Sequence, residues 1–389
     1  LSMLLIAVLA LTAVPALAAN DAGTNYTLST EGVVVLQDIA DRNITPAAGA
    51  LDVNPVIEGQ SPTTGMPVSG DSLYMPMLVQ ISNPEGSVKV DGKNVTAAGI
   101  GQRAPWGGQY ADIVYEGILY RSGQTRITFL YNDSFAEGQP LSAGPVRSAR
   151  IGHVLLREEW QAGGPRREEN NIAAMFAELG ASDKGVTFNL LDGKYQEYKN
   201  RVSGVKSPDN YNVNVVGIRS LIPATTVATE HPFLFSDASP YVDGYEVAYN
   251  INLDWGHKVY ISHFYYDEAN NLYLRYSGDA PYMTFAEAED RSEENQEQMS
   301  FSNVIIQRVG YEYTNNSKIM PVMQSVGKGN ADIFIGGRYI PGYWVRESIE
   351  SPTVFLDDKG NEIQLTPGKT FIAHFPPESL LTYSASAAQ

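Results

Sequence analysis

The feature that most constrains the fold is a series of short β-branched and aromatic runs that begins after Ala238. Turn sequences such as Asp267-Glu268-Ala269-Asn270 separate these runs, which is typical of antiparallel hairpins. Valine, isoleucine and tyrosine favour the half-buried surface of a sheet, and the chain contains 23 Tyr. We therefore predict a mostly antiparallel β domain in the second half, with strands within 245–253, 257–266, 271–276, 304–311, 319–326 and 331–335.

The first half of the chain combines strand-like and helix-like patterns. Short apolar or β-branched runs predict strands at 77–81, 111–120 and 125–131. Apolar residues near helical spacing predict helices at 148–162 and 170–179, ended by Gly163-Gly164-Pro165 and by Gly180. An acidic stretch at 286–298 predicts a short surface helix. The predicted fold class is α+β: a mixed α/β N-terminal domain followed by a mostly antiparallel β C-terminal domain.

An apolar run near the N-terminus indicates export. Residues 3–13 are apolar except Thr12, and the small-residue triplet Ala16-Leu17-Ala18 follows Pro15. This arrangement is typical of a secretory signal peptide. We predict a signal peptide at 1–19, a flexible spacer at 20–61, an N-terminal domain at 62–232 and a C-terminal domain at 238–378. The alternative is that the apolar run stays uncut and anchors the protein to a membrane.

Composition excludes several classes of function. The formal charge is −17, from 27 basic and 44 acidic residues, and this charge repels nucleic acid. The chain has no cysteine, which excludes thiolate nucleophiles, cysteine-ligated zinc and attachment of a lipid to a cysteine. No histidines have metal-ligand spacing. We therefore expect no metal, no cofactor and no nucleic-acid partner.

Several motifs make the chain resemble the YerB-like lipoproteins, a bacterial family with N- and C-terminal domains of unknown function (DUF3048). The most specific is Gly144-Pro145-Val146-Arg147-Ser148-Ala149-Arg150, and Thr125-Arg126 and Gly336-Gly337-Arg338-Tyr339 also match. The resemblance implies an extracytoplasmic protein of two domains and no established activity. The chain departs from the family in reading Pro208-Asp209-Asn210 where a Pro-His-Asn turn is typical, and in lacking a lipid-attachment cysteine.

The arginine motif is the candidate binding site. We predict a helix that starts just after Gly144-Pro145, with Arg147, Ser148 and Arg150 in its first turn. Free N–H groups at a helix start attract anions, and arginine there opposes the helix dipole, which points to a functional reason for it. A phosphate or carboxylate group would fit, and Arg126 and Asn210, from the motifs above, join the candidate residues.

Asp112 and Glu116 are four residues apart on a predicted strand and so share one face. The structural alternative for the motif is that Arg147 and Arg150 pair with these two carboxylates. A catalytic alternative is an enzyme that acts on phosphate-bearing envelope substrates, with the arginines as clamps and Asp112 or Glu116 as base. A carbohydrate-binding module, based on Tyr343 and Trp344, is a third possibility.

The sequence thus predicts an extracytoplasmic protein of the cell envelope, secreted, periplasmic or at the cell surface. We expect a non-catalytic binding or accessory protein whose partner is an anionic envelope ligand or a wall polymer. A membrane is expected as a partner only through an uncut signal anchor.

Overall fold

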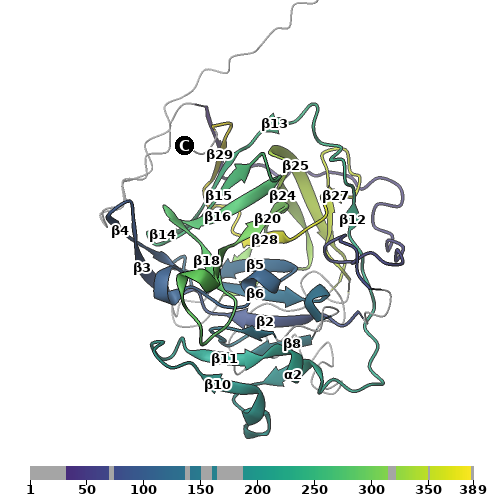
Figure 1. Ribbon diagram of the computed structural model, residues 1–389. Coiled ribbons are helices and arrows are strands. Elements are labelled where there is room, and N and C mark those ends of the chain that lie inside the picture. The colour runs from purple at the N-terminus through teal and green to yellow at the C-terminus, as the bar shows by residue number, and fades with distance from the viewer. Residues whose placement is uncertain are drawn as a thin grey trace, which may run out of the picture.

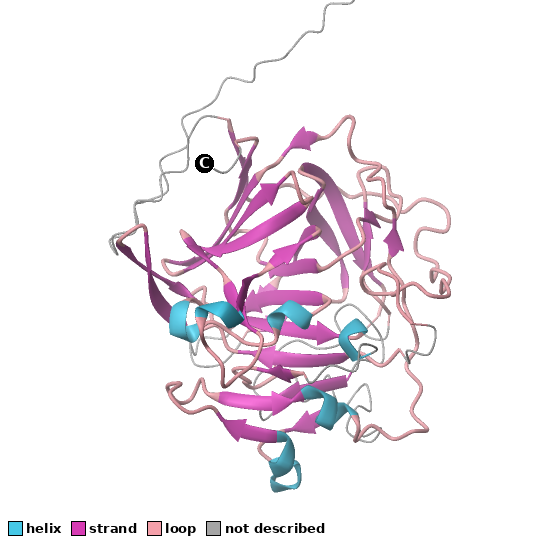
Figure 2. Cartoon of the chain, viewed as in Figure 1, coloured by secondary structure: helices cyan, strands magenta, loops and turns pink. Residues whose placement is uncertain are grey.

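The computed structural model describes residues 32–69, 74–135, 141–149, 160–163, 187–313, 321–348 and 351–386. Strands dominate this part of the chain (Figure 2). Its helical elements are one five-residue α-helix, α2 (Val215–Arg219), and the short 3-10 turns η1, η2, η3, η5 and η6. The protein is therefore mostly β, and the predicted α+β class with a mixed α/β N-terminal domain is wrong.

Each predicted helix that falls on described residues fails. Ser148 and Ala149 are extended, residues 150–159 lie outside the described residues, and Trp160–Gly163 forms strand β8. The predicted helix at 170–179 also lies outside them. Residues 286–298 contain only the 3-10 turn η6 (Glu293–Asn295) and strand β19 (Gln296–Gln298). β8 pairs in parallel with β2 (Met77–Ile81), and such long-range pairing outweighs a weak local helix preference.

The largest sheet has eleven strands and runs through the middle of the molecule (Figure 1). It confirms the predicted strands at 77–81, 111–120 and 125–131. Its order is β13 (Glu246–Val247), β25 (Arg338–Arg346), β24 (Gly327–Ile335), β21 (Asn303–Arg308), β28 (Thr370–Phe375), β5 (Ile113–Ile118), β6 (Thr125–Tyr131), β2, β8 and β9 (Thr187–Asn189), with β26 (Val354–Leu356) beside β25.

Strand β28 joins the two halves of the chain. It pairs in parallel with β21 on one side and with β5 on the other, so that Thr370 lies between Asn303 and Ile113. The predicted regions 62–232 and 238–378 therefore meet inside one sheet. A second sheet packs on the first, in the order β1 (Val33–Leu36), β29 (Leu381–Ser384), β14 (Asn250–His257), β15 (Tyr260–Asp267), β16 (Leu272–Ser277) and β17 (Ala280–Pro281), with β20 (Ser300–Phe301) beside β16.

Both faces of the large sheet are buried. On one face Phe371 of β28 lies 4.8 Å, between ring centroids, from Phe264 of the second sheet, and Ile372 belongs to a separate core on the other face. Strands covered on both faces read as nearly continuous apolar runs. Smaller sheets complete the fold: β10 (Lys199–Arg201), β11 (Tyr211–Asn214) and β7 (Ser142–Ala143); β3 (Glu85–Val90) and β4 (Lys93–Ala98); β12 (Leu234–Phe235) and β27 (Gln364–Leu365); β18 (Met283–Phe285) and β19; β22 (Tyr311–Glu312) and β23 (Val322–Met323).

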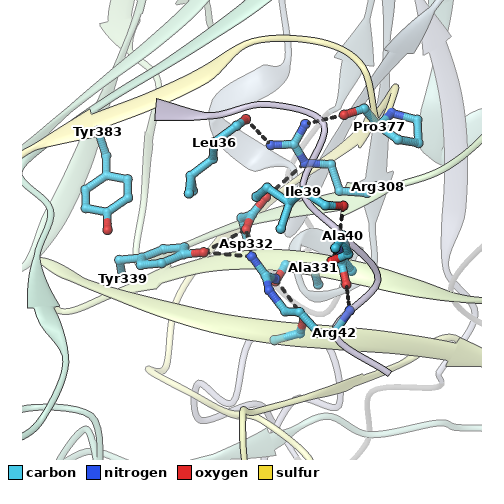
Figure 3. A network of polar contacts seen from close by, with 12 residues as sticks. Leu36, Ile39, Ala40, Arg42, Arg308, Ala331, Asp332, Tyr339, Pro377 and Tyr383 are labelled. Atoms are coloured by element: carbon cyan, nitrogen blue, oxygen red, sulfur yellow. Dashed lines mark hydrogen bonds and ion pairs between the residues drawn. The ribbon is translucent and has the colours of Figure 1, made fainter. Parts of the chain in front are cut away.

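Residues 32–61, which we call the strap, lie along the folded body. β1 pairs antiparallel with β29, and Arg42 reaches into the large sheet, where its Nη2 lies 2.5 Å from the carboxylate of Asp332 (Figure 3). Arg308 contacts the other oxygen of the same carboxylate at 2.9 Å, and Asn54 donates to Glu362. A flexible spacer at 20–61 does not describe this segment, because side chains with poor periodicity still form specific long-range bonds.

We expect Arg42→Ala to destabilise the protein and release the strap. Asp332 is fully buried and would keep only Arg308 as a cationic partner, so the expected loss is about 3 kcal/mol. Chemical denaturation measures the loss, and limited proteolysis should cut the variant first within residues 32–61. Lys89→Ala, at an exposed position of β3, is the control and should change stability by less than about 0.5 kcal/mol. Equal stability and equal protease resistance of both variants would contradict the role of Arg42.

Candidate functional site

The arginine motif forms an extended segment that lies against Trp106 and against the end of β2. Gly144 pairs with Trp106, and Val146 pairs with Ile81 at the end of β2. The Arg147 N–H donates to the carbonyl of Gln80 at 2.9 Å. Glycine is required at position 144 because a Cβ there would lie 2.2 Å from the Trp106 ring. The predicted helix start is wrong for residues 144–149, so helix N–H groups provide no anion site here.

Arg103 and Arg147 meet at Asp209, in the loop before β11, and Arg126 contacts the same extended segment at Ser148. We call Arg103, Arg126 and Arg147 the arginine cluster. Its internal counter-charge is Asp209, which lies 3.3 Å from Nη1 of Arg103 and 3.9 Å from Nε of Arg147. Ser82 also donates to Asp209 at 2.7 Å.

Arg126 belongs to the cluster through β6 and is the most buried of the three. Its Nη1 donates to the carbonyl of Ser148 at 2.9 Å, which brings together two of the predicted site residues. Tyr260, at the start of β15, lies within electrostatic range of Arg126 and Asp209. Burial first, then the nearby acidic groups, raises the pKa of Tyr260 to about 12, so its hydroxyl keeps its proton at neutral pH.

Glu116 lies in a closed network beside the cluster. Its carboxylate is 2.8 Å from Nη2 of Arg275, and both side chains are 1% exposed. Ser262 and Thr125 donate to the same carboxylate at 2.7 and 2.5 Å, and Asn83 donates at 3.3 Å. The Arg275 guanidinium also lies over the Tyr282 ring, 3.9 Å from its centroid. Every oxygen of Glu116 is therefore engaged inside the protein.

Asp112 points into a different network, at the start of β5. It accepts hydrogen bonds from the Thr63 hydroxyl at 2.8 Å and from the Asp133 N–H at 3.1 Å. Burial first, and then the charge of Asp133, raises the pKa of Asp112 well above its ordinary value. The predicted pairing of Arg147 with Asp112 or Glu116 is absent from the described contacts, because Arg147 pairs with Asp209. Arg150 lies outside the described residues.

The remaining candidates are engaged elsewhere. Asn210 accepts a hydrogen bond from Arg201 of β10 at 2.8 Å, and Ser148 contributes its carbonyl rather than its hydroxyl. Tyr343 and Trp344, the basis for a carbohydrate-binding face, are 1% and 3% exposed strand residues. Their burial leaves no aromatic platform for a sugar.

Sequence reasoning missed Arg103, Ser82 and Asp209 as parts of this site. Asp209 had a signal, since it stands where the family typically has histidine. Arg103 and Ser82 had no such signal in the sequence. Arg103 reaches the cluster through the packing of η1 (Gly101–Arg103), and Ser82 reaches it because it follows the end of β2. Among the described residues, no group of three or more His, Asp or Glu side chains could hold a metal ion. No helix of this part of the chain is long and apolar enough to cross a membrane.

Conversion into amides should reduce stability much more at Glu116 than at Asp112. Glu116→Gln leaves the Arg275 guanidinium buried without its counter-charge, and we expect a loss of about 3–5 kcal/mol. Asp112→Asn replaces a carboxyl group that burial already favours in its neutral form, and its amide oxygen can keep both hydrogen bonds, so we expect a loss below about 1 kcal/mol. Denaturation of both variants at neutral pH measures the difference. Equal losses would mean that the Glu116–Arg275 pair is not a closed, charge-balanced unit.

The comparisons agree with the family named above. Residues 64–227 match the model of the N-terminal domain of the protein of unknown function DUF3048, and residues 251–372 match the model of its C-terminal domain. The crystal structure of the YerB protein from Bacillus subtilis is similar, with 21% identity and a TM-score of 0.61. The similarity covers 82% of this chain and 96% of that one, and it shows a shared fold. No curated protein matches the chain.

Proposed function

The chain belongs to the DUF3048 family, and we propose that it is a non-catalytic, extracytoplasmic envelope protein that binds an anionic ligand at the arginine cluster. The ligand class is a phosphate or carboxylate group, such as those of a wall polymer. The partly exposed side chain of Arg147, with its long ion pair, is the observation that carries this proposal.

Arg147 has unused binding capacity. Its side chain is 30% exposed, and its ion pair with Asp209 spans 3.9 Å, which is beyond ordinary hydrogen-bond length. Arg103 is 22% exposed and holds the same carboxylate at 3.3 Å. Two guanidinium groups thus share one carboxylate in a protein whose formal charge is −17. Guanidinium groups bind phosphate and carboxylate through paired N–H donors, so a second anion suits this cluster.

The closed carboxylate networks favour binding over catalysis. A general base must come within hydrogen-bond reach of the proton that it removes. Glu116 is held by Arg275, Ser262, Thr125 and Asn83, and Asp112 is buried against Thr63 and Asp133. An enzyme that used either carboxylate as base would first have to open a buried network.

Replacing Arg103 and Arg147 together with alanine should weaken binding of an anion by at least about tenfold, since losing even one charge-assisted hydrogen bond removes roughly 1.5 kcal/mol. Asp209→Asn should strengthen binding, because it removes the carboxylate that competes for the guanidinium groups. Calorimetric titration with poly(glycerol phosphate) and with inorganic phosphate measures both changes. Asp209 is buried and keeps the Ser82 hydroxyl as its donor in the arginine variant, so circular dichroism must show that this variant is folded before its binding is compared.

Arg121→Ala, at an exposed position in the turn between β5 and β6, is the control and should bind as the wild type does. Binding should also fall as salt concentration rises. An arginine variant that folds and retains full affinity, or an Asp209→Asn variant that binds more weakly, would refute the anion site.

Export is supported by the apolar run at 3–13 and the triplet Ala16-Leu17-Ala18. Expressed from a complete gene, the mature protein should begin at Ala19 or Asn20 and lie outside the cytoplasm. Cell fractionation and intact mass measure this. A soluble cytoplasmic protein that retains residues 1–18 would contradict the extracytoplasmic location.

A further inference from the structure

A groove of about 440 Å³ opens beside the strap, far along the chain from the arginine motif. One wall is the strap at Ile39 and Asp41, and another is Pro377. Its floor is formed by the first residues of β24 and by Trp344 of β25. The remaining lining residues are Arg308, Gly310, Gln324 and Val326. Of these four, Val326 has an apolar side chain.

The groove lies where β24 extends past its neighbour. Toward β21 the last pair of residues is Ala331 with Gln307, whereas toward β25 the pairing continues to Gly327 with Arg346. Residues 327–330 therefore have a strand partner on one side only within the described part of the chain. A half-strand of this kind is a template for another extended chain.

The backbone of Lys328 faces the open side. Pro341 has no N–H, so its pair with Asp332 is a non-hydrogen-bonded pair of the β24–β25 ladder. Such pairs alternate along the ladder, which makes the pair of Lys328 with Val345 non-hydrogen-bonded as well. Lys328 therefore directs its N–H and C=O away from β25, toward the groove.

Gly327 leaves the first residue of this edge accessible, because nothing lies within 4 Å of where its Cβ would be. Gly310 and Gly329 are closely packed, since a Cβ there would lie 2.5 Å from the Gln324 side chain and 2.9 Å from the Trp344 ring. Glycine within a strand often marks close approach of another backbone. A small polar ligand would use the side chains of the groove but would leave the peptide groups of the half-strand unmatched, whereas an extended peptide would match both.

Lys328 is the group of the groove that can pair with an acidic partner. Arg308 is committed to Asp332 and to carbonyls that include Leu36. The exposed Asp41 carboxylate on the strap accepts from the Asn43 N–H and keeps its negative charge, so the acidic group of a partner is expected at Lys328 and not beside the strap. Lys328 is exposed and has no ion-pair partner among the described residues. In a chain with 44 acidic residues, an unpaired lysine beside an open strand edge is complementary to a carboxylate.

We propose that this groove binds an extended peptide segment of a partner protein by β-strand addition along Gly327–Asn330, with a carboxylate of the peptide against Lys328. Backbone bonding supplies affinity and the flanking side chains supply selectivity, as in other edge-strand complexes. The strap forms one wall of the site, because Asn330 donates to the carbonyls of Ile39 and Ala40 and accepts from the Arg42 N–H at 2.9 Å. The site is independent of the arginine cluster.

Selection of random seven-residue linear peptides on phage against the full chain tests the proposal. The recovered peptides should bind one to one and carry an acidic residue at a fixed position. Lys328→Glu should weaken their binding by about tenfold or more, as expected when an attractive ion pair becomes repulsive. Val326→Trp should abolish binding, because Val326 lines the groove and is 46% exposed. Lys89→Glu makes the same charge change on β3 and should have no effect.

Hydrogen exchange separates strand addition from other modes of binding. A bound peptide should slow exchange of the Lys328 amide, which faces the groove. Failure to recover any peptide that Val326→Trp excludes, or binding without protection of Lys328, would overturn the proposal. A concentration-dependent dimer that Val326→Trp dissolves would replace the peptide with a second copy of the chain. Retained peptide binding in Arg103→Ala/Arg147→Ala keeps this result separate from the anion site.

Discussion

Parallel pairing of β28 on both of its sides is the interaction on which the rest of the fold depends. β28 lies near the C-terminus, yet it fills the position between β5 of the first half and β21 of the second. Parallel neighbours cannot be joined by a tight turn, so neither pairing can form from a local hairpin. Without Thr370–Phe375 the eleven-stranded sheet would divide into two smaller sheets, each with an exposed apolar edge. The two regions matched by the family models thus contribute strands to one sheet.

Burial distinguishes the three groups of paired charges. Glu116 with Arg275 and Asp332 with Arg42 and Arg308 are enclosed, and removing one partner from such a group strands a charge in a low-dielectric interior. Asp209 with Arg103 and Arg147 is partly exposed and has longer contacts. The first two groups hold strands together, whereas the third is expected to contribute less to stability. This difference in burial is the reason that the proposed anion site is placed at the third group.

The local sequence pattern correctly predicted the strands that pair within a hairpin. It failed for segments whose secondary structure depends on contacts with distant parts of the chain. β5 and β6 are adjacent in sequence and joined by a turn, so their β-branched runs were sufficient. Trp160–Gly163 forms a strand between β2 and β9, and no local signal specified these neighbours. The strap has a composition typical of a spacer, but Arg42 finds a buried carboxylate almost 300 residues away in sequence. In the candidate site, residue types indicated Arg126 and Arg147, but Asp209, the counter-charge of Arg147, depended on the fold.

The contacts of the strap follow a definite order along the sequence, and this order determines where tension from the N-terminal segment would act. From its N-terminal end, the strap first forms β1, which makes four residue pairs with β29. The hydrogen bonds from Arg308 to Leu36 and from Asn330 to Ile39 and Ala40 follow along the sequence. If the N-terminal segment tethers the protein, tension along it acts first on β1 and only afterwards on the groove wall. Antiparallel backbone pairing and the buried Arg42–Asp332 contact thus lie on either side of the groove wall along the strap. In a tethered protein, the β1–β29 pairing would therefore give way before the wall of the proposed peptide groove.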